Sequence, residues 1–131
     1  MDYDRVSESY ARCCASSGFF DTFYDKFLAA SDEIPLLFAN TDFVKQKEML
    51  EHSITYMLAY AAGRKYAAEG LARIAELHSR RDRDIDPKFY PLWLDCLCEA
   101  IKAHDAEWSL ELEEEWRQDM RKGIEFMIAR Y

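Results

Sequence analysis

The chain has little that would interrupt a helix, since only four glycines and three prolines occur in its 131 residues. Long helices joined by short loops are therefore expected. Long apolar runs are lacking too, and none approaches the ~20 residues that a membrane-spanning helix needs. The first ten residues are acidic and polar, so no secretory signal is visible. These absences predict a soluble, cytoplasmic protein.

Basic residues are outnumbered, with 17 Lys and Arg against 25 Asp and Glu, so the formal net charge is −8. An acidic surface is a poor match for nucleic acid or for an anionic membrane. The four cysteines stand as Cys13-Cys14 and Cys96-x-Cys98, spacings that fit neither a zinc ribbon nor a thioredoxin-like redox pair. We expect them to be buried or half-buried free thiols in a reducing compartment.

Aromatic residues, in contrast, are plentiful. They make up 15% of the chain, and hydrophobic residues make up half of it. Such a set can line a large flat apolar ligand, although it can also serve packing alone. The length suits a single domain spanning residues 1–131, with no internal repeat or linker.

The apolar residues recur at helical spacing, and no segment alternates as a strand would. The first helix should turn Val6, Tyr10, Cys13 and Cys14 inward. Gly63 and the glycine at position 70 bracket an expected loop. Six or seven unequal helices favour an irregular all-α fold over a four-helix bundle. Their expected bounds are about 3–17, 19–31, 34–38, 43–62, 71–78, 86–104 and 109–130.

Three polar residues fall on otherwise apolar helix faces. Gln46 is either a residue that reaches solvent near a helix start or one that lines a cavity. Tyr24 is either a core tyrosine bonded to a carbonyl or a ligand donor. His78 either interacts with the negative end of its helix dipole or points inward to bind iron. His52 and His104 are expected to have surface roles.

Two stretches, FYDKFLAA at 23–30 and LFANTDFVKQK at 37–47, resemble bacterial globins. That family places a phenylalanine–tyrosine pair on its second helix and a phenylalanine fourteen residues after the tyrosine, as Tyr24 and Phe38 stand here. Its distal helix presents two residues four apart, matched by Gln46 and Leu50. Leu77-His78 followed by DPKFYP at 86–91 is similar to the proximal histidine and the start of the next helix.

The resemblance implies a globin-like fold around one haem b, with His78 as the iron ligand. Tyr24 and Gln46 would donate hydrogen bonds to bound oxygen, whose partial negative charge such donors stabilise in a dry pocket. The Nδ1 atom of His78 should donate to a backbone carbonyl near residue 74, which fixes the tautomer. The implied haem-contacting residues are Phe38, Phe43, Leu50, Ile74, His78 and Tyr90.

The sequence departs from the related flavohaemoglobins in two ways. Those proteins pair a proximal tyrosine with a glutamate, and Tyr90 matches the tyrosine while Tyr131 stands in the glutamate's place. No glycine-rich dinucleotide loop is present, so any turnover would need a separate reductase.

The resemblance leaves three functions open. The first is reversible binding of diatomic gases (O2, NO, CO), which would extend to nitric oxide dioxygenase activity given that reductase. The second is a haem-based sensor that signals to another chain. The third is an interaction module without haem. We expect a monomer, or a homodimer formed through the last two long helices.

Overall fold

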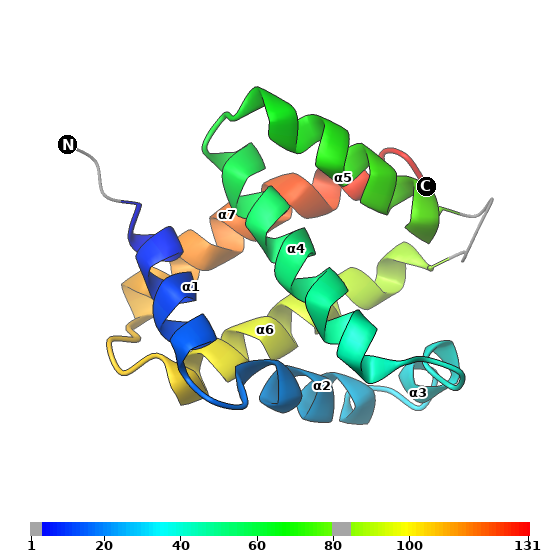
Figure 1. Cartoon of the computed structure of the whole chain (residues 1–131), viewed down its shortest axis with the longest axis horizontal. Coiled ribbons are helices and arrows are strands. Elements are labelled where there is room, and N and C mark those ends of the chain that lie inside the picture. The colour runs from blue at the N-terminus through cyan, green and yellow to red at the C-terminus, as the bar shows by residue number, and fades with distance from the viewer. Residues whose placement is uncertain (1–3, 80–84) are drawn as a thin grey trace. The chain divides into compact units, whose positions relative to one another are not determined.

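The computed structural model describes residues 4–79 and 85–131, and within these ranges the chain forms helices and no strand (Figure 1). This confirms the prediction of an all-α fold with six or seven helices. None of the helices in the described ranges is long and apolar enough to cross a membrane. The helices are α1 (Arg5–Ala15), α2 (Phe19–Ala29), α3 (Ile34–Leu37), α4 (Phe43–Ala61), α5 (Lys65–His78), α6 (Tyr90–His104) and α7 (Leu110–Ile128), with a 3-10 turn (Pro87–Phe89) before α6.

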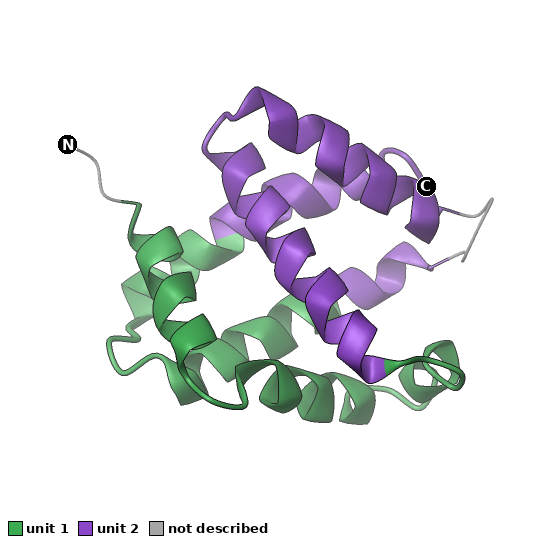
Figure 2. Ribbon diagram, viewed as in Figure 1, with its two compact units in different colours: residues 1–42, 91–117 green, residues 43–90, 118–131 purple. Residues whose placement is uncertain are grey.

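The chain divides into two compact units, coloured green and purple in Figure 2. Unit 1 comprises residues 1–42 and 91–117, and it holds α1, α2, α3, most of α6 and the beginning of α7. Unit 2 comprises residues 43–90 and 118–131, and it holds α4, α5 and the remainder of α7.

In unit 1, α1 and α7 begin at side-chain caps, and the helices turn an apolar face inward. Asp4 accepts a hydrogen bond from the backbone N–H of Val6 at 3.0 Å and thereby caps α1. The Ser109 hydroxyl accepts from the N–H of Leu112 at 3.1 Å at the start of α7. Each cap satisfies a donor that the helix itself leaves without a partner. The inward residues include Val6, Cys13, Phe19, Phe23, Leu97, Ile101, Leu112 and Trp116.

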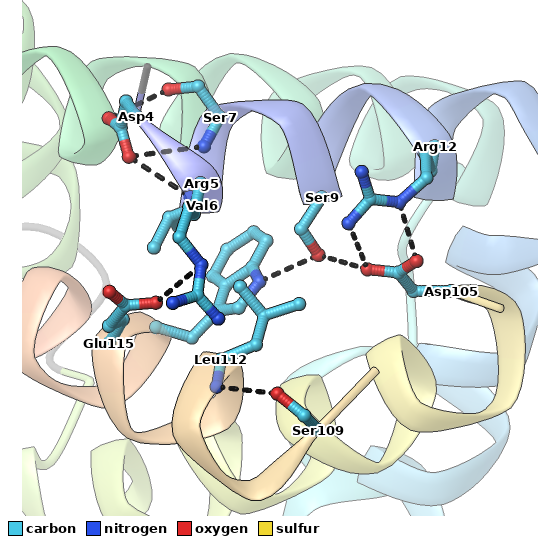
Figure 3. A network of polar contacts seen from close by, with 11 residues as sticks. Asp4, Arg5, Val6, Ser7, Ser9, Arg12, Asp105, Ser109, Leu112 and Glu115 are labelled. Carbon is cyan, nitrogen blue, oxygen red and sulfur yellow. Dashed lines mark hydrogen bonds and ion pairs between the residues drawn. The ribbon is translucent and has the colours of Figure 1, made fainter. Parts of the chain in front are cut away.

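A buried polar network ties α1 to the end of α6 and to α7 (Figure 3). The indole N–H of Trp116 donates to the Ser9 hydroxyl at 3.0 Å, and that hydroxyl donates to an Asp105 carboxylate oxygen at 2.6 Å. Arg12 donates from two nitrogens to the two oxygens of Asp105, at 2.6 and 3.0 Å. The backbone N–H of Glu107 also donates to this carboxylate. The network therefore leaves no uncompensated charge on Asp105, whose side chain is fully buried.

Unit 2 packs α4 against both α5 and the second half of α7. A Cβ atom added at Gly70 on α5 would lie 2.5 Å from the Tyr56 ring on α4, so the two helices meet closely here. Gly123 on α7 meets Met57 on α4 in the same way, because a Cβ atom added at Gly123 would lie 2.8 Å from the Met57 side chain. These glycines let helix backbones approach where a larger residue would hold them apart.

The structure corrects three details of the sequence analysis. Gly70 lies inside α5, which begins at Lys65, so the loop expected up to residue 70 is shorter. A glycine often marks the end of a helix because its backbone is conformationally free. Gly70 instead lies inside the helix, where its missing side chain allows close packing against Tyr56. Cys14 is exposed although Cys13 is buried, and none of the four cysteines forms a disulfide. The segment after Asp86 starts as a 3-10 turn, capped by the Asp86 carboxylate, before α6 begins at Tyr90.

Substitution of Gly70 by alanine should destabilise the protein. The new methyl group would overlap the Tyr56 ring, and overpacking of this kind costs about 1–3 kcal/mol. Alanine's better helix propensity would return about 1 kcal/mol of that loss. We expect a lower denaturation midpoint in urea, and a Gly70→Ala, Tyr56→Leu double variant should recover part of it. A midpoint unchanged by Gly70→Ala would show that the contact is not restrictive.

Candidate functional site

His78 is the last residue of α5, and its imidazole is held by its own helix. The Nδ1 atom lies 2.8 Å from the backbone carbonyl oxygen of Ile74, one turn earlier. A carbonyl can only accept, so Nδ1 carries the proton, and in the neutral imidazole the lone pair is then on Nε2. This contact is the one expected from the sequence, and it is the arrangement that metal-ligating histidines usually show.

The backbone around His78 is also anchored. The N–H of Ile85 donates to the His78 carbonyl oxygen at 3.0 Å. Ser79, which is buried, donates from both its N–H and its hydroxyl to the carbonyl of Glu76, at 3.2 and 2.7 Å. The end of α5 thus has hydrogen-bond partners for carbonyls that the helix would otherwise leave open. The half-buried imidazole of His78 is consequently fixed at its side chain and at its main chain.

The predicted residues on α4 lie along one face of that helix. Phe43 and Gln46 are half-buried, and Leu50 is buried with 4% of its surface exposed. Their spacing of three and four residues places them on successive turns of the same side. Gln46 thus lies on the same side of α4 as the buried Leu50, and its half-burial is compatible with both interpretations of this residue.

Ile74 and Tyr90 belong to one hydrophobic cluster of unit 2. Ile74 is buried together with Ala75 and Met127, and Tyr90 packs against this group. Burial raises the pKa of the Tyr90 phenol to about 12, with a smaller contribution from Tyr131. Tyr90 is thus a neutral phenol at physiological pH. The nearby group at the chain end is another tyrosine, in keeping with the departure from flavohaemoglobins that the sequence indicates.

Tyr24 and Phe38 come together in unit 1. Their ring centroids are 5.9 Å apart in an edge-to-face arrangement, and only 5% of Tyr24 is exposed. Phe27 contacts Phe38 at 6.1 Å, and Phe23 contacts Tyr24 at 5.0 Å. The fourteen-residue spacing in the sequence therefore corresponds to a real ring contact. It joins α2 to the residue that ends α3.

The other two histidines differ from each other. His52 is exposed on α4, as expected. The prediction for His104 was wrong: it is half-buried, with Nδ1 2.7 Å from the Ser16 hydroxyl and Nε2 2.7 Å from the Thr22 hydroxyl. The sequence around His104 gives no sign of these partners, because both hydroxyls belong to residues far away along the chain.

Within residues 4–79 and 85–131, no group of three or more His, Cys, Asp and Glu side chains could hold a metal ion.

Comparison with known proteins identifies the family. No protein-family model matches the chain, and no curated protein matches it. A crystal structure of a protein from Pseudomonas aeruginosa PAO1, described as structurally highly homologous to human haemoglobin, superposes with a TM-score of 0.93. The two sequences are 43% identical over 98% of this chain and 96% of the other. The chain belongs to the bacterial single-domain globins.

The globin fold suggests haem as the cofactor, and the residues of this globin fit such a group. The deciding observation is His78, whose protonated Nδ1 and anchored backbone leave Nε2 in the electronic form that binds iron. A single neutral histidine suffices for haem iron because the porphyrin itself supplies four nitrogen ligands. The absence of a three-residue metal cluster in the described ranges is therefore compatible with a haem site.

Proposed function

We propose that this globin binds haem b and takes up a diatomic gas, with Nε2 of His78 as the protein ligand to the iron. The observation that carries the proposal is the 2.8 Å contact between His78 Nδ1 and the Ile74 carbonyl. That contact fixes the imidazole in the ligating tautomer and raises its basicity. The 43% identity to a protein described as structurally highly homologous to human haemoglobin supports the globin fold on which the proposal rests.

The residues of this chain have separate tasks in the proposal. Haem, when bound, supplies the iron atom that takes up the gas. Tyr24 and Gln46 donate hydrogen bonds to the gas, and Leu50 keeps water away from it. Apolar contact with the haem would come from Phe38, Phe43, Leu50, Ile74 and Tyr90. A buried donor stabilises partial negative charge better than water does, so oxygen release should be slow and discrimination in favour of carbon monoxide weak.

Titration of the purified protein with haemin tests the proposal directly. The expected result is a sharp Soret band that saturates at one haemin per chain, with the spectrum of a histidine-ligated iron after reduction. Carbon monoxide should then shift the band of the reduced protein. Weak binding that does not saturate at this ratio would point instead to a globin-like interaction module without haem.

Replacing Tyr24 by phenylalanine should speed oxygen dissociation. The variant keeps the ring contact with Phe38 and removes only the hydroxyl donor. Loss of a hydrogen bond worth about 1.5–3 kcal/mol corresponds to a dissociation rate roughly 10–100 times higher. Stopped-flow displacement of oxygen by carbon monoxide measures this rate. Tyr10→Phe, a change in a buried tyrosine that contacts Trp116, is the matched control. Equal rates in the Tyr24 variant and the wild type would remove Tyr24 from the gas site.

The same donors would support nitric oxide dioxygenation, in which oxygen, nitric oxide and one electron give nitrate. In this proposal a separate reductase supplies the electron, since residues 1–131 hold no dinucleotide-binding loop. Nitrate formation by the haem-loaded protein with a flavin reductase and NADH distinguishes this activity from plain oxygen binding. The Tyr24→Phe variant should form nitrate more slowly, because it releases oxygen before nitric oxide arrives.

A further inference from the structure

The imidazole of His104, at the end of α6, lies between two hydroxyl groups of unit 1. Its Nδ1 atom is 2.7 Å from the hydroxyl of Ser16, the residue that follows α1. Its Nε2 atom is 2.7 Å from the hydroxyl of Thr22 on α2. The buried Phe19 ring meets the imidazole edge-on, at 5.8 Å between centroids and an angle of 84°. These three contacts hold the imidazole in one orientation.

The two hydroxyls must play different parts in this arrangement. A neutral imidazole has one N–H donor and one lone pair, so it donates to one hydroxyl and accepts from the other. Free histidine prefers the tautomer with its proton on Nε2. In that tautomer Nε2 donates to Thr22, and the Ser16 hydroxyl donates to Nδ1. A hydroxyl bonded to a base, with a third group that orients the base, is the arrangement that activates a serine nucleophile.

Ser16 is also within reach of small molecules in solution. Ser16 and His104 are half-buried, and Cys14, Ala15 and Ser17 beside Ser16 are exposed. Ser9 differs, because it is fully buried and donates its hydroxyl proton to the Asp105 carboxylate. The turn after α1 therefore combines an accessible hydroxyl with a fixed base.

We propose that Ser16 is a covalent modification site for small acyl donors with a good leaving group, such as acyl phosphates and aryl esters. His104 is the general base of this reaction. Thr22 is a positioning residue, because it acts only through the imidazole. The proposal uses none of the residues assigned to haem or gas binding, so it stands or falls separately from the proposed function.

The reaction moves one proton and exchanges one bond. As Oγ of Ser16 attacks the acyl carbon, the hydroxyl proton passes to Nδ1 of His104. The new bond from Oγ to the acyl carbon replaces the bond to the leaving oxygen, which departs with its electron pair as a phosphate or a phenolate. Nδ1 then gives its proton to solvent. The product is an ester on Ser16, and neither an oxidant nor a reductant takes part.

A fluorophosphonate reagent tests the site, because it labels activated serine hydroxyls by losing fluoride and reacts poorly with ordinary ones. We expect one adduct per chain, located at Ser16 by peptide mapping. A general base contributes about 100–10,000-fold, so Ser16 should react at least about 100 times faster than Ser109. Ser109 is the matched serine, since it is half-buried but its hydroxyl caps α7. Equal labelling of the two serines, or none at Ser16, would overturn the proposal.

Variants assign the parts of the reaction. His104→Gln keeps a hydrogen-bonding side chain that cannot take up a proton, and it should label about 100 times more slowly or worse. Thr22→Val should slow labelling several-fold and leave the adduct on Ser16. His52→Gln, at an exposed histidine, is the control and should label as the wild type does. An unchanged rate in His104→Gln, or an adduct on Thr22 in the wild type, would contradict the assignment.

Acetyl phosphate then tests the proposed class of donor. The exposed thiol of Cys14 can also take an acetyl group, but neutral hydroxylamine cleaves thioesters and leaves oxygen esters intact. After this treatment, peptide mapping should find an acetyl group on Ser16 in the wild type and almost none there in His104→Gln. Equal acetylation of Ser16 in the two proteins would contradict the role of the imidazole.

Discussion

Replacement of His78 by alanine is expected to reduce haem affinity by more than about 100-fold, which corresponds to roughly 3 kcal/mol. Loss of a residue that only orients a metal ligand costs about 10–100-fold, and loss of the ligand itself should exceed this range. The reduced protein should also lose the spectrum of histidine-ligated iron. Haemin titration followed by reduction and resonance Raman spectroscopy of the iron–histidine stretch measures both effects.

The protein offers a matched control for this variant. His52 is an exposed histidine on α4, and His52→Ala should bind haem as the wild type does. A His78→Gly variant should regain its ligation when imidazole is added, because imidazole can occupy the space of the missing ring. A His78→Ala protein with an unchanged Soret band and unchanged ligation would rule out His78 as the ligand.

Asp105→Ala is expected to lower the free energy of unfolding by about 3 kcal/mol. Removal of one member of a buried ion pair typically costs about 3–5 kcal/mol, and partial exposure of Arg12 places this case near the lower end. The Ser9 hydroxyl would also lose its acceptor inside the protein. Urea denaturation followed by circular dichroism measures the change. Asp95→Ala removes an exposed carboxylate paired with Arg117 and should cost at most about 1 kcal/mol.

The contribution of Asp105 should also depend on pH. Burial alone would raise its pKa, but hydrogen bonds from Arg12, Ser9 and the Glu107 N–H outweigh burial and hold it below the ordinary value of 3.8. A group with a lowered pKa stabilises the folded state above its unfolded pKa and loses that contribution as the pH falls through the folded value. The stability gap between wild type and Asp105→Ala should therefore be constant at neutral pH and shrink below about pH 4. A gap that widens on acidification would contradict this assignment.

The local pattern of the sequence predicts the helices well because each one has a single buried face. The α7 residues Leu112, Trp116, Met120 and Met127 recur at helical spacing, and all of them are buried. Some starts are also marked by residues that cap them, as Asp4 marks α1 and Asp86 marks the 3-10 turn before α6. The His78 contact could be predicted as well, because the resemblance to globins makes His78 an iron ligand and the second nitrogen of such a histidine usually donates to a carbonyl.

Contacts between distant segments could not be predicted from one sequence. Ser9 and Asp105 are 96 residues apart, and each looks like an ordinary surface residue by local pattern. His104 likewise depends on Ser16 and Thr22, which are separated from it by more than 80 residues. Gly70 shows the same limit for packing, because only the fold reveals that its missing side chain makes room for Tyr56. Periodicity indicates which face is buried but does not indicate what lies opposite.

The bond between His78 and the Ile74 carbonyl links the chemistry of the proposed iron ligand to fraying of a helix end. The carbonyl that fixes the imidazole proton belongs to Ile74, which lies one turn before His78 at the end of α5. When that turn unwinds, the imidazole loses its preferred tautomer together with its orientation. Amide hydrogen exchange at His78 should therefore report how readily the proposed ligand loses its orientation.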